Sequence, residues 1–250
     1  MSEIDLVATL CILAVAGFVQ AVFGLGFAMI ATPLLALYLD YTQAVFLVAV
    51  PLFVLAVYYL VRARHHLPQA HSPVALVSGI VLGAAVGVWL HVSLPERIAL
   101  VLLAALLVFS VVVPRVIADV HGSVAAAQRG APAFGLMAGV TESALNVGAP
   151  FMVLLGGLAR YDRVQQLIAL NLCFAFGKAI QLTLLTSVSG VPVGAGATAG
   201  AVAIALLGYR VGDRFAGRWD GQRFRRALDA FLLLMALALV ARGLAPGNLP

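Results

Sequence analysis

The stretch GFVQAVFGLGFAMIATPLLALYLD, residues 17–40, decides the fold. It belongs to an apolar block, 4–39, that would make about 54 Å of continuous helix, whereas the hydrocarbon core of a bilayer is about 30 Å thick. The block carries Gly24-Leu25-Gly26 in its middle, the polar Gln20 just before them and a proline after them. Two structures fit such a block: a steeply tilted single helix, or a hairpin that is broken at the glycines.

The composition of the whole chain indicates the class of protein to which this stretch belongs. Hydrophobic residues make up 63% of the chain and charged residues 10%, and the mean hydropathy is +1.09; soluble domains have about 45–50% apolar and about 25% charged residues. Further apolar blocks occupy 42–61, 73–93, 97–114, 131–159, 164–188, 192–212 and 224–242. The sequence therefore predicts an all-α polytopic membrane protein in a lipid bilayer. The formal charge of +5 has no soluble domain to act on, so no nucleic-acid partner is expected. Cys11 and Cys173 are isolated, so we expect no disulfide, metal or cofactor.

The arginines distinguish the two structures for the long blocks, 4–39 and 131–159. If each block crosses the membrane once, the 14 arginines divide nine against five between the two faces. If each block goes across and returns, they divide twelve against two. Because positive residues gather on the cytoplasmic face, the second partition favours hairpins and places both termini outside the cytoplasm. A full hairpin and a helix followed by a re-entrant half give the same partition, so both stay open.

The two long blocks also align with each other. A shift of 122 residues pairs Gly17 with Gly139, Gln20 with Glu142, Gly24 with Asn146, Gly26 with Gly148, Asp40 with Asp162 and Gln43 with Gln165. This register predicts two repeats, 1–120 and 121–250, each with a Gly-broken hairpin and three transmembrane helices. Five segments are an odd number, so the second repeat is expected to be inverted relative to the first. Asp40 and Asp162 are interpreted as helix caps or hinge residues, not as ligands.

The breaks themselves suggest a binding site. Gly24 and Gly26 can adopt backbone angles that other residues avoid, and a half-helix that begins near Phe27 leaves its first amides unpaired. The start of such a helix attracts anions. The equivalent break at Asn146-Val147-Gly148 begins a second half-helix, and the two starts would form an anion cradle at the membrane midplane. The alternative is that these glycines only allow close helix packing.

Charged groups inside apolar blocks extend the candidate site, because they are costly there and usually functional. Lys178 would neutralise the anion, and Asn171 and Gln181 share its helix face. Glu142 either pairs with Lys178 or takes up a proton that couples transport to the proton gradient; a purely structural pair is the alternative. The candidate substrate-binding residues are Gln20, Gly24, Gly26, Thr141, Glu142, Asn146, Gly148, Asn171, Lys178 and Gln181, with Ser143 and Thr32 as weaker hydroxyl candidates.

Both motifs resemble a known family. GFVQAVFGLGFAMIATPLLAL, 17–37, is similar to the first motif of the TauE/SafE sulfite exporters (TSUP transporters). GVTESALNVGAPFMVLLGG, 139–157, is similar to the second copy, and Tyr161-Asp162-Arg163 resembles the short loop that follows it. The resemblance implies a bacterial-type inner membrane and the transport, often outward, of sulfite, organosulfonates or small carboxylates.

Two classes of function remain. The first is a secondary transporter that exports sulfite or a short organosulfonate, with an uptake permease or a channel for a small anion as the alternative. The second is an intramembrane enzyme, which is disfavoured because the sequence offers no nucleophile–base set and no histidine-rich face. The direction of transport, the coupling ion and the oligomeric state are left open; proton coupling and an oligomer are both compatible with the sequence.

Overall fold

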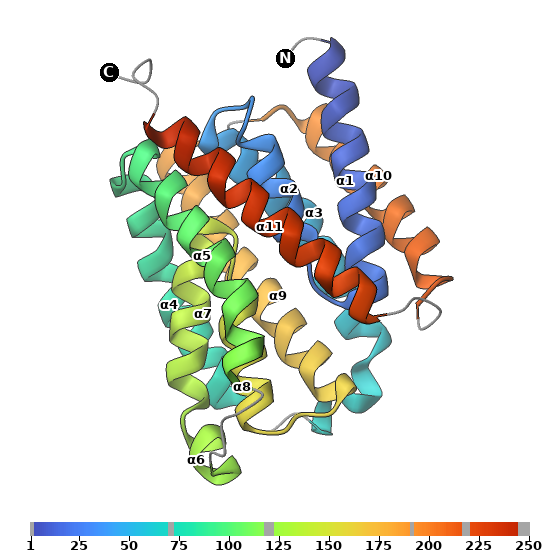
Figure 1. The fold of residues 1–250 in the computed structure, drawn as a ribbon, viewed down its shortest axis with the longest axis vertical. Helices are drawn as coiled ribbons and strands as arrows, with labels where there is room; N and C mark the ends of the chain where they lie inside the picture. Colours follow the sequence, from blue (N-terminus) through green and yellow to red (C-terminus); the bar gives the residue numbers. More distant parts are fainter. Residues whose placement is uncertain (1–2, 70–72, 118–122, 191–192, 217–220, 245–250) are drawn as a thin grey trace.

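In a computed structural model, the chain folds as a bundle of α-helices (Figure 1). The structure describes residues 3–69, 73–117, 123–190, 193–216 and 221–244; the predicted repeat boundary at 120 and Arg218 lie outside these ranges. The helices are α1 (Glu3–Phe23), α2 (Phe27–Leu35), α3 (Tyr41–Arg62), the 3₁₀ turn η1 (Arg64–Gln69), α4 (Pro73–Ser93), α5 (Glu96–Ile117), α6 (Val124–Arg129), α7 (Ala131–Leu145), α8 (Ala149–Leu158), α9 (Arg163–Ser189), α10 (Ala195–Asp213) and α11 (Gly221–Leu244). The described residues form no strand, which confirms the predicted all-α class.

Seven helices are long and apolar enough to cross a membrane: α1, α3, α4, α5, α9, α10 and α11. Block 4–39 contains α1 and α2, and block 131–159 contains α7 and α8; α2, α7 and α8 are shorter than the seven. The nine residues of α2 and the ten of α8 make only about 14 and 15 Å of helix. Neither can cross a core of about 30 Å alone. The tilted single helix is therefore wrong for both blocks. In the first block, the long α1 and the short α2 favour a helix followed by a re-entrant half, whereas in the second block neither α7, with 15 residues, nor α8 is among the seven spanning helices.

The breaks fall at the positions that the sequence predicts. Between α1 and α2, Gly24 has φ +78° and Gly26 has φ +118°. Between α7 and α8, Asn146 has φ +60°. L-residues other than asparagine and aspartate rarely adopt such angles, because Cβ meets the backbone, so the glycines and the asparagine end their helices here.

Caps begin the long helices that follow each short arm. Asp40 accepts hydrogen bonds from the amides of Thr42 (2.9 Å) and Gln43 (3.2 Å) at the start of α3. Asp162 accepts one from the amide of Gln165 (2.8 Å), whose side chain bonds back to the Asp162 amide (3.1 Å). Both predicted caps are confirmed.

Helices from the two halves of the chain pack against each other. α1 packs against α10, and α7 packs against α4. α5 contacts α8, α11 contacts α2, and α5 and α11 contact each other. A shift of 122 residues places α1 on α7, α2 on α8, α4 on α10 and α5 on α11. The α1–α10 contact then corresponds to the α7–α4 contact, and the α11–α2 contact corresponds to the α5–α8 contact, as a repeat would produce. The inverted relation of the halves stays a prediction.

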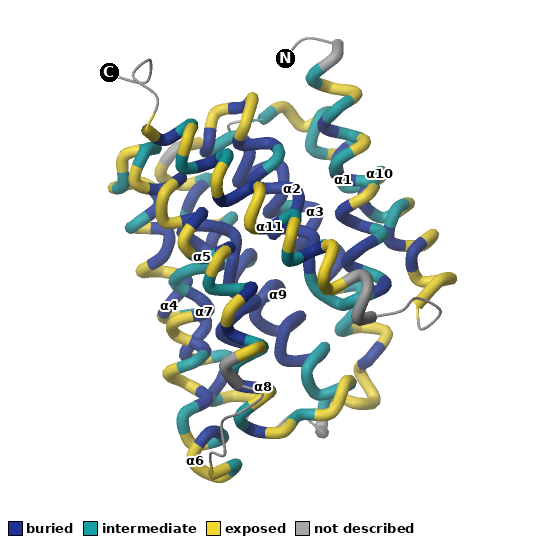
Figure 2. The backbone as a smooth tube through the Cα atoms, in the orientation of Figure 1, coloured by how far each residue is buried: buried dark blue, intermediate teal, exposed yellow. Residues whose placement is uncertain are grey.

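Burial and the chain ends complete the arrangement. Figure 2 shows that buried residues concentrate in α2, α3 and α9, which lie between the α1–α10 pair and the α4–α5–α7 group. Both termini lie at one end of the molecule, and α6 lies at the other (Figure 1). At the terminal end, Arg242 contacts Glu96 and the carbonyl of Leu39. The α1–α2 break therefore lies away from the termini, at the far end of α1.

Glycines allow the closest of these helix contacts. A Cβ at Gly83 on α4 would collide with the Leu136 carbonyl on α7, and Gly79 and Gly87 make equivalent approaches to α7. Backbones that approach so closely gain dispersion contacts and leave no room for a larger residue.

We expect Gly83→Ala to lower the free energy of unfolding by about 1–3 kcal/mol, because the added methyl forces α4 and α7 apart. Unfolding of the purified protein in detergent measures the change. Gly200→Ala on α10 is the matched control, since a Cβ there meets no atom within 4 Å. Equal stability of the two variants would show that the α4–α7 contact is looser than described.

Candidate functional site

At the second break, two backbone hydrogen bonds end α7, and one side chain binds the amide at the start of α8. The amide of Asn146 donates to the carbonyl of Glu142 (3.1 Å), and the amide of Val147 donates to that of Thr141 (3.2 Å). The chain then turns, and the amide of Gly148 donates to Oε2 of Glu142 (2.8 Å). The carboxylate of Glu142 thus reaches across the break and caps the start of α8.

Lys178, on α9, closes this arrangement. Its side chain and that of Glu142 are both 0% exposed, and Nζ lies 2.7 Å from Oε1 of Glu142. Nζ also donates to the carbonyl of Glu142 (2.9 Å), Oδ1 of Asn146 (2.6 Å) and Oε1 of Gln181 (2.9 Å). An ammonium has three protons, and four acceptors surround this one, so Lys178 has no donor left for a ligand in this conformation.

The same network connects four helices. Gln181 donates to the carbonyl of Ser143 (2.8 Å). Asn146 donates to Oγ1 of Thr32 on α2 (3.2 Å) and to the carbonyl of Val45 on α3 (3.1 Å). We call Glu142, Asn146, Lys178 and Gln181, with Ser143 and Thr32, the break network. Through Asn146, this network connects the second break to α2 and α3 of the first half.

The first break has a smaller version of the same cap. Gln20 is 3% exposed, donates to the carbonyl of Gly24 (3.2 Å) and accepts from the amide of Phe27 (3.1 Å) at the start of α2. Gln20 and Glu142 occupy the same position of the 122-residue register, and each side chain reaches the amide group that starts its half-helix. The expectation that the first amides are unpaired is therefore wrong at Phe27 and Gly148.

Two of the predicted site residues have side chains that take part in the bonds of neither break. The hydroxyl of Thr141 donates to the carbonyl of Met137 (2.9 Å), and the side-chain amide of Asn171 donates through Nδ2 to the carbonyl of Leu167 (2.8 Å), each within its own helix. In the part of the chain that the structure describes, neither is bonded to Lys178 or Glu142. The predicted shared face brings Gln181, but not Asn171, to the lysine.

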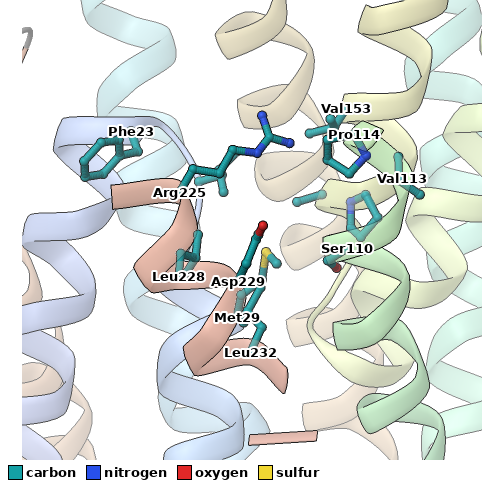
Figure 3. Close-up of a pocket in the computed structure, with 13 residues that line it drawn as sticks. Phe23, Met29, Ser110, Val113, Pro114, Val153, Arg225, Leu228, Asp229 and Leu232 are labelled. Atoms are coloured by element: carbon teal, nitrogen blue, oxygen red, sulfur yellow. The ribbon is translucent and has the colours of Figure 1, made fainter. Parts of the chain in front are cut away.

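A cavity of about 210 Å³ lies beside both breaks (Figure 3). Phe23, Leu25 and Met29 line it from the α1–α2 break, and Ala149, Pro150 and Val153 line it from the start of α8. The remaining lining residues are Ser110, Val113 and Pro114 of α5 and Arg225, Leu228, Asp229 and Leu232 of α11. The starts of the two half-helices thus face one space, which we call the tip cavity.

The charged residues of the tip cavity come from α11. Arg225 and Asp229, one turn apart, both point into the space between α11 and α5 in Figure 3. Asp229 forms an ion pair with Arg115 of α5 (2.8 Å). Arg225 is exposed, and among the described residues it forms no ion pair.

Sequence reasoning missed Arg225, Asp229 and Ser110 as site candidates. Arg225 entered the prediction only as one of the 14 arginines that indicate orientation. The i, i+4 spacing of Arg225 and Asp229 at the start of an apolar block was the available signal, because it places both charges on one face of α11.

Comparison with known families decides the identity of the chain. The family model described as Sulfite exporter TauE/SafE matches residues 9–239, a range that contains both breaks, the break network and the tip cavity. The chain belongs to the TauE/SafE family. It is a multi-pass membrane transporter of that family, as its motifs predict. No curated protein and no solved structure matches the chain.

Proposed function

We propose that this TauE/SafE protein is a secondary transporter that exports a small anion, sulfite or a short organosulfonate, and that the anion binds in the tip cavity. One observation carries the proposal: the starts of both half-helices and the guanidinium of Arg225, which forms no ion pair among the described residues, line the same space. We place the protein in the inner membrane of a bacterial-type cell, with both termini outside the cytoplasm.

The cavity suits an anion in charge and size. Each half-helix contributes a partial positive charge at its start, and Arg225 contributes a full one. Asp229 forms an ion pair with Arg115, and this pairing reduces the repulsion between the Asp229 carboxylate and an incoming anion. The volume is several times the roughly 30 Å³ that one water occupies in the liquid. An anion of four or five heavy atoms therefore fits.

The break network has a different part in this proposal. The Glu142–Lys178 pair is fully buried and its two charges cancel, so it adds no net charge to the cavity. Its contribution is to fix the start of α8 through the bond from Gly148 to Glu142. Lys178, Gln20, Asn146 and Gln181 then act on the substrate by holding the two starts in place. Lys178 would touch the anion only in a conformation in which the network opens.

Anion binding to the purified protein tests the proposal, with thermal stability as the readout. We expect sulfite or a short sulfonate to stabilise the protein, by about 2.7 kcal/mol at one hundred times its Kd. Acetate, chloride and taurine, which is a zwitterion, serve as comparison ligands. Arg225→Gln should weaken binding about tenfold or more, a loss of about 1.4 kcal/mol.

Arg226→Gln is the matched control, because Arg226 is an exposed neighbour on α11 that does not line the cavity. It should bind the anion as the wild type does. If no anion stabilises the protein, the proposed function is wrong. If Arg225→Gln and Arg226→Gln bind equally well, the tip cavity is not the binding site.

A further inference from the structure

A second cavity, of about 220 Å³, opens at the end of the molecule that holds the termini. Asp40, Tyr41 and Thr42 line it from the start of α3. His91, Val92, Leu94 and Glu96 line it from the end of α4 and the start of α5. We call it the terminal cavity. Its mouth is acidic, since Asp40 and Glu96 are its charged lining residues.

His91 lines this cavity, and one of its ring nitrogens has no hydrogen-bond partner among the described residues. The residue is 9% exposed, and Nδ1 lies 3.1 Å from the carbonyl oxygen of Ala144. A carbonyl can only accept, so Nδ1 carries the hydrogen and Nε2 of the neutral ring is a bare acceptor. Nε2 is buried, and no group of the described residues bonds to it. A buried acceptor without a partner costs free energy unless something binds there.

The ligand that fits Nε2 is a proton. Among the described residues, no group of three histidine, cysteine, aspartate or glutamate side chains could hold a metal ion. Histidine is the side chain that takes up a proton near neutral pH. Because Glu96 is paired with Arg242, Asp40 is the lining carboxylate that attracts a cation entering this cavity.

The charged groups near the His91 ring lie on several helices. Asp40, at the start of α3, and Lys178, on α9, both act electrostatically on His91. Lys178 is paired with Glu142 of α7, and Glu96 is paired with Arg242 of α11 (3.3 Å). The ring of Tyr41 lies 5.6 Å from that of His91.

The two cavities approach the second break from opposite ends of the molecule. His91 and the hydroxyl of Tyr41 (3.3 Å) both bond to the carbonyl of Ala144, two residues before Asn146. The tip cavity begins at Ala149, three residues after Asn146. The break network lies between them. A charge at His91 would therefore act directly on the carbonyl of Ala144, at the end of α7 and two residues before Asn146 of the break network.

We propose that His91 binds a proton from the terminal cavity and couples that proton to anion binding in the tip cavity. This inference rests on the proposed function. A proton on His91 adds positive charge beside the break, and an anion adds negative charge, so each ligand strengthens the binding of the other. Glu142 is less suited to the role, because Lys178 and the amide of Gly148 occupy its two oxygens.

Binding of methanesulfonate or sulfate, which stay ionised throughout, tests the coupling between about pH 5 and pH 8, the range in which histidine exchanges its proton. We expect the wild-type Kd to rise by up to about tenfold per pH unit, the limit for one linked proton. His91→Gln should remove this slope. His66→Gln, an exposed histidine of η1, should keep it.

Calorimetry of the wild type in two buffers of different ionisation enthalpy adds a readout that needs no variant. It should show proton uptake when the anion binds. Anion binding without proton uptake, or a pH slope that survives His91→Gln, would overturn the role of His91 and leave the anion site intact. If neither anion nor sulfite binds at any pH, the proposed function fails and the coupling with it.

Discussion

Lys178→Met is expected to lower the free energy of unfolding by about 3–5 kcal/mol, the usual cost of leaving one partner of a buried ion pair alone. The substitution keeps the apolar stem and removes the ammonium. The carboxylate of Glu142, 0% exposed, then loses its counterion, and Asn146 and Gln181 lose a donor. Chemical unfolding in detergent, followed by circular dichroism, measures the loss.

A double variant separates the lone charge from the lost packing. Glu142→Gln with Lys178→Met removes both charges, so it should recover part of the loss. Arg62→Met breaks the exposed pair with Asp213, whose side chains are 53% and 40% exposed, and should cost at most about 1 kcal/mol. A Lys178→Met variant as stable as Arg62→Met would mean that the Glu142–Lys178 pair reaches water.

Arg225→Glu is expected to lower anion flux through proteoliposomes by about a hundredfold, equivalent to about 2.7 kcal/mol. The reversal removes the guanidinium that lines the tip cavity without an ion pair among the described residues, and it adds a second carboxylate one turn from Asp229. The new carboxylate can also lie at the starts of α2 and α8, where it would occupy the place of the anion. The fold should be unaffected, because Arg225 is exposed and no partner is lost.

Arg226→Glu makes the same change of charge outside the cavity and should reduce the flux only slightly. Both variants should keep the thermal stability of the wild type. A loss of flux that is equal in both variants would indicate a general effect of surface charge on anion supply, and it would argue against a binding role for Arg225.

Local chemistry made much of the fold predictable. Apolar blocks too long for one crossing, with glycines at 24 and 26 and an asparagine at 146, predicted breaks at the places where the structure has positive φ. Asp40 and Asp162 predicted caps because a short carboxylate accepts from the next amides. Each signal is contained within a few residues of the chain, so it does not depend on the packing of distant segments.

The arrangement of the site was only partly predictable. The sequence identified Lys178 and Glu142 as buried charges, but it could not show that four acceptors enclose the lysine, since they come from two helices and a turn. It also could not show that α11 brings Arg225 beside Met29 and Pro150. That contact depends on how distant helices pack, which no local pattern encodes.

The two breaks differ in a way that bears on mechanism. In the 122-residue register, Glu142 corresponds to Gln20 and Lys178 to Ala56, so the second break is held by an ion pair and the first by a single neutral amide. The start of α8 is thus fixed more firmly than the start of α2. We expect the α1–α2 arm to move first when the tip cavity opens or closes.

The central claim is that the anion lies between the starts of α2 and α8. A structure of the protein loaded with selenate, an electron-dense analogue of a sulfur oxyanion, tests it most directly. The account predicts selenium density in the tip cavity, within hydrogen-bonding distance of the guanidinium of Arg225. Density beside Lys178 or on the arginine-rich surface, with the tip cavity empty, would contradict it.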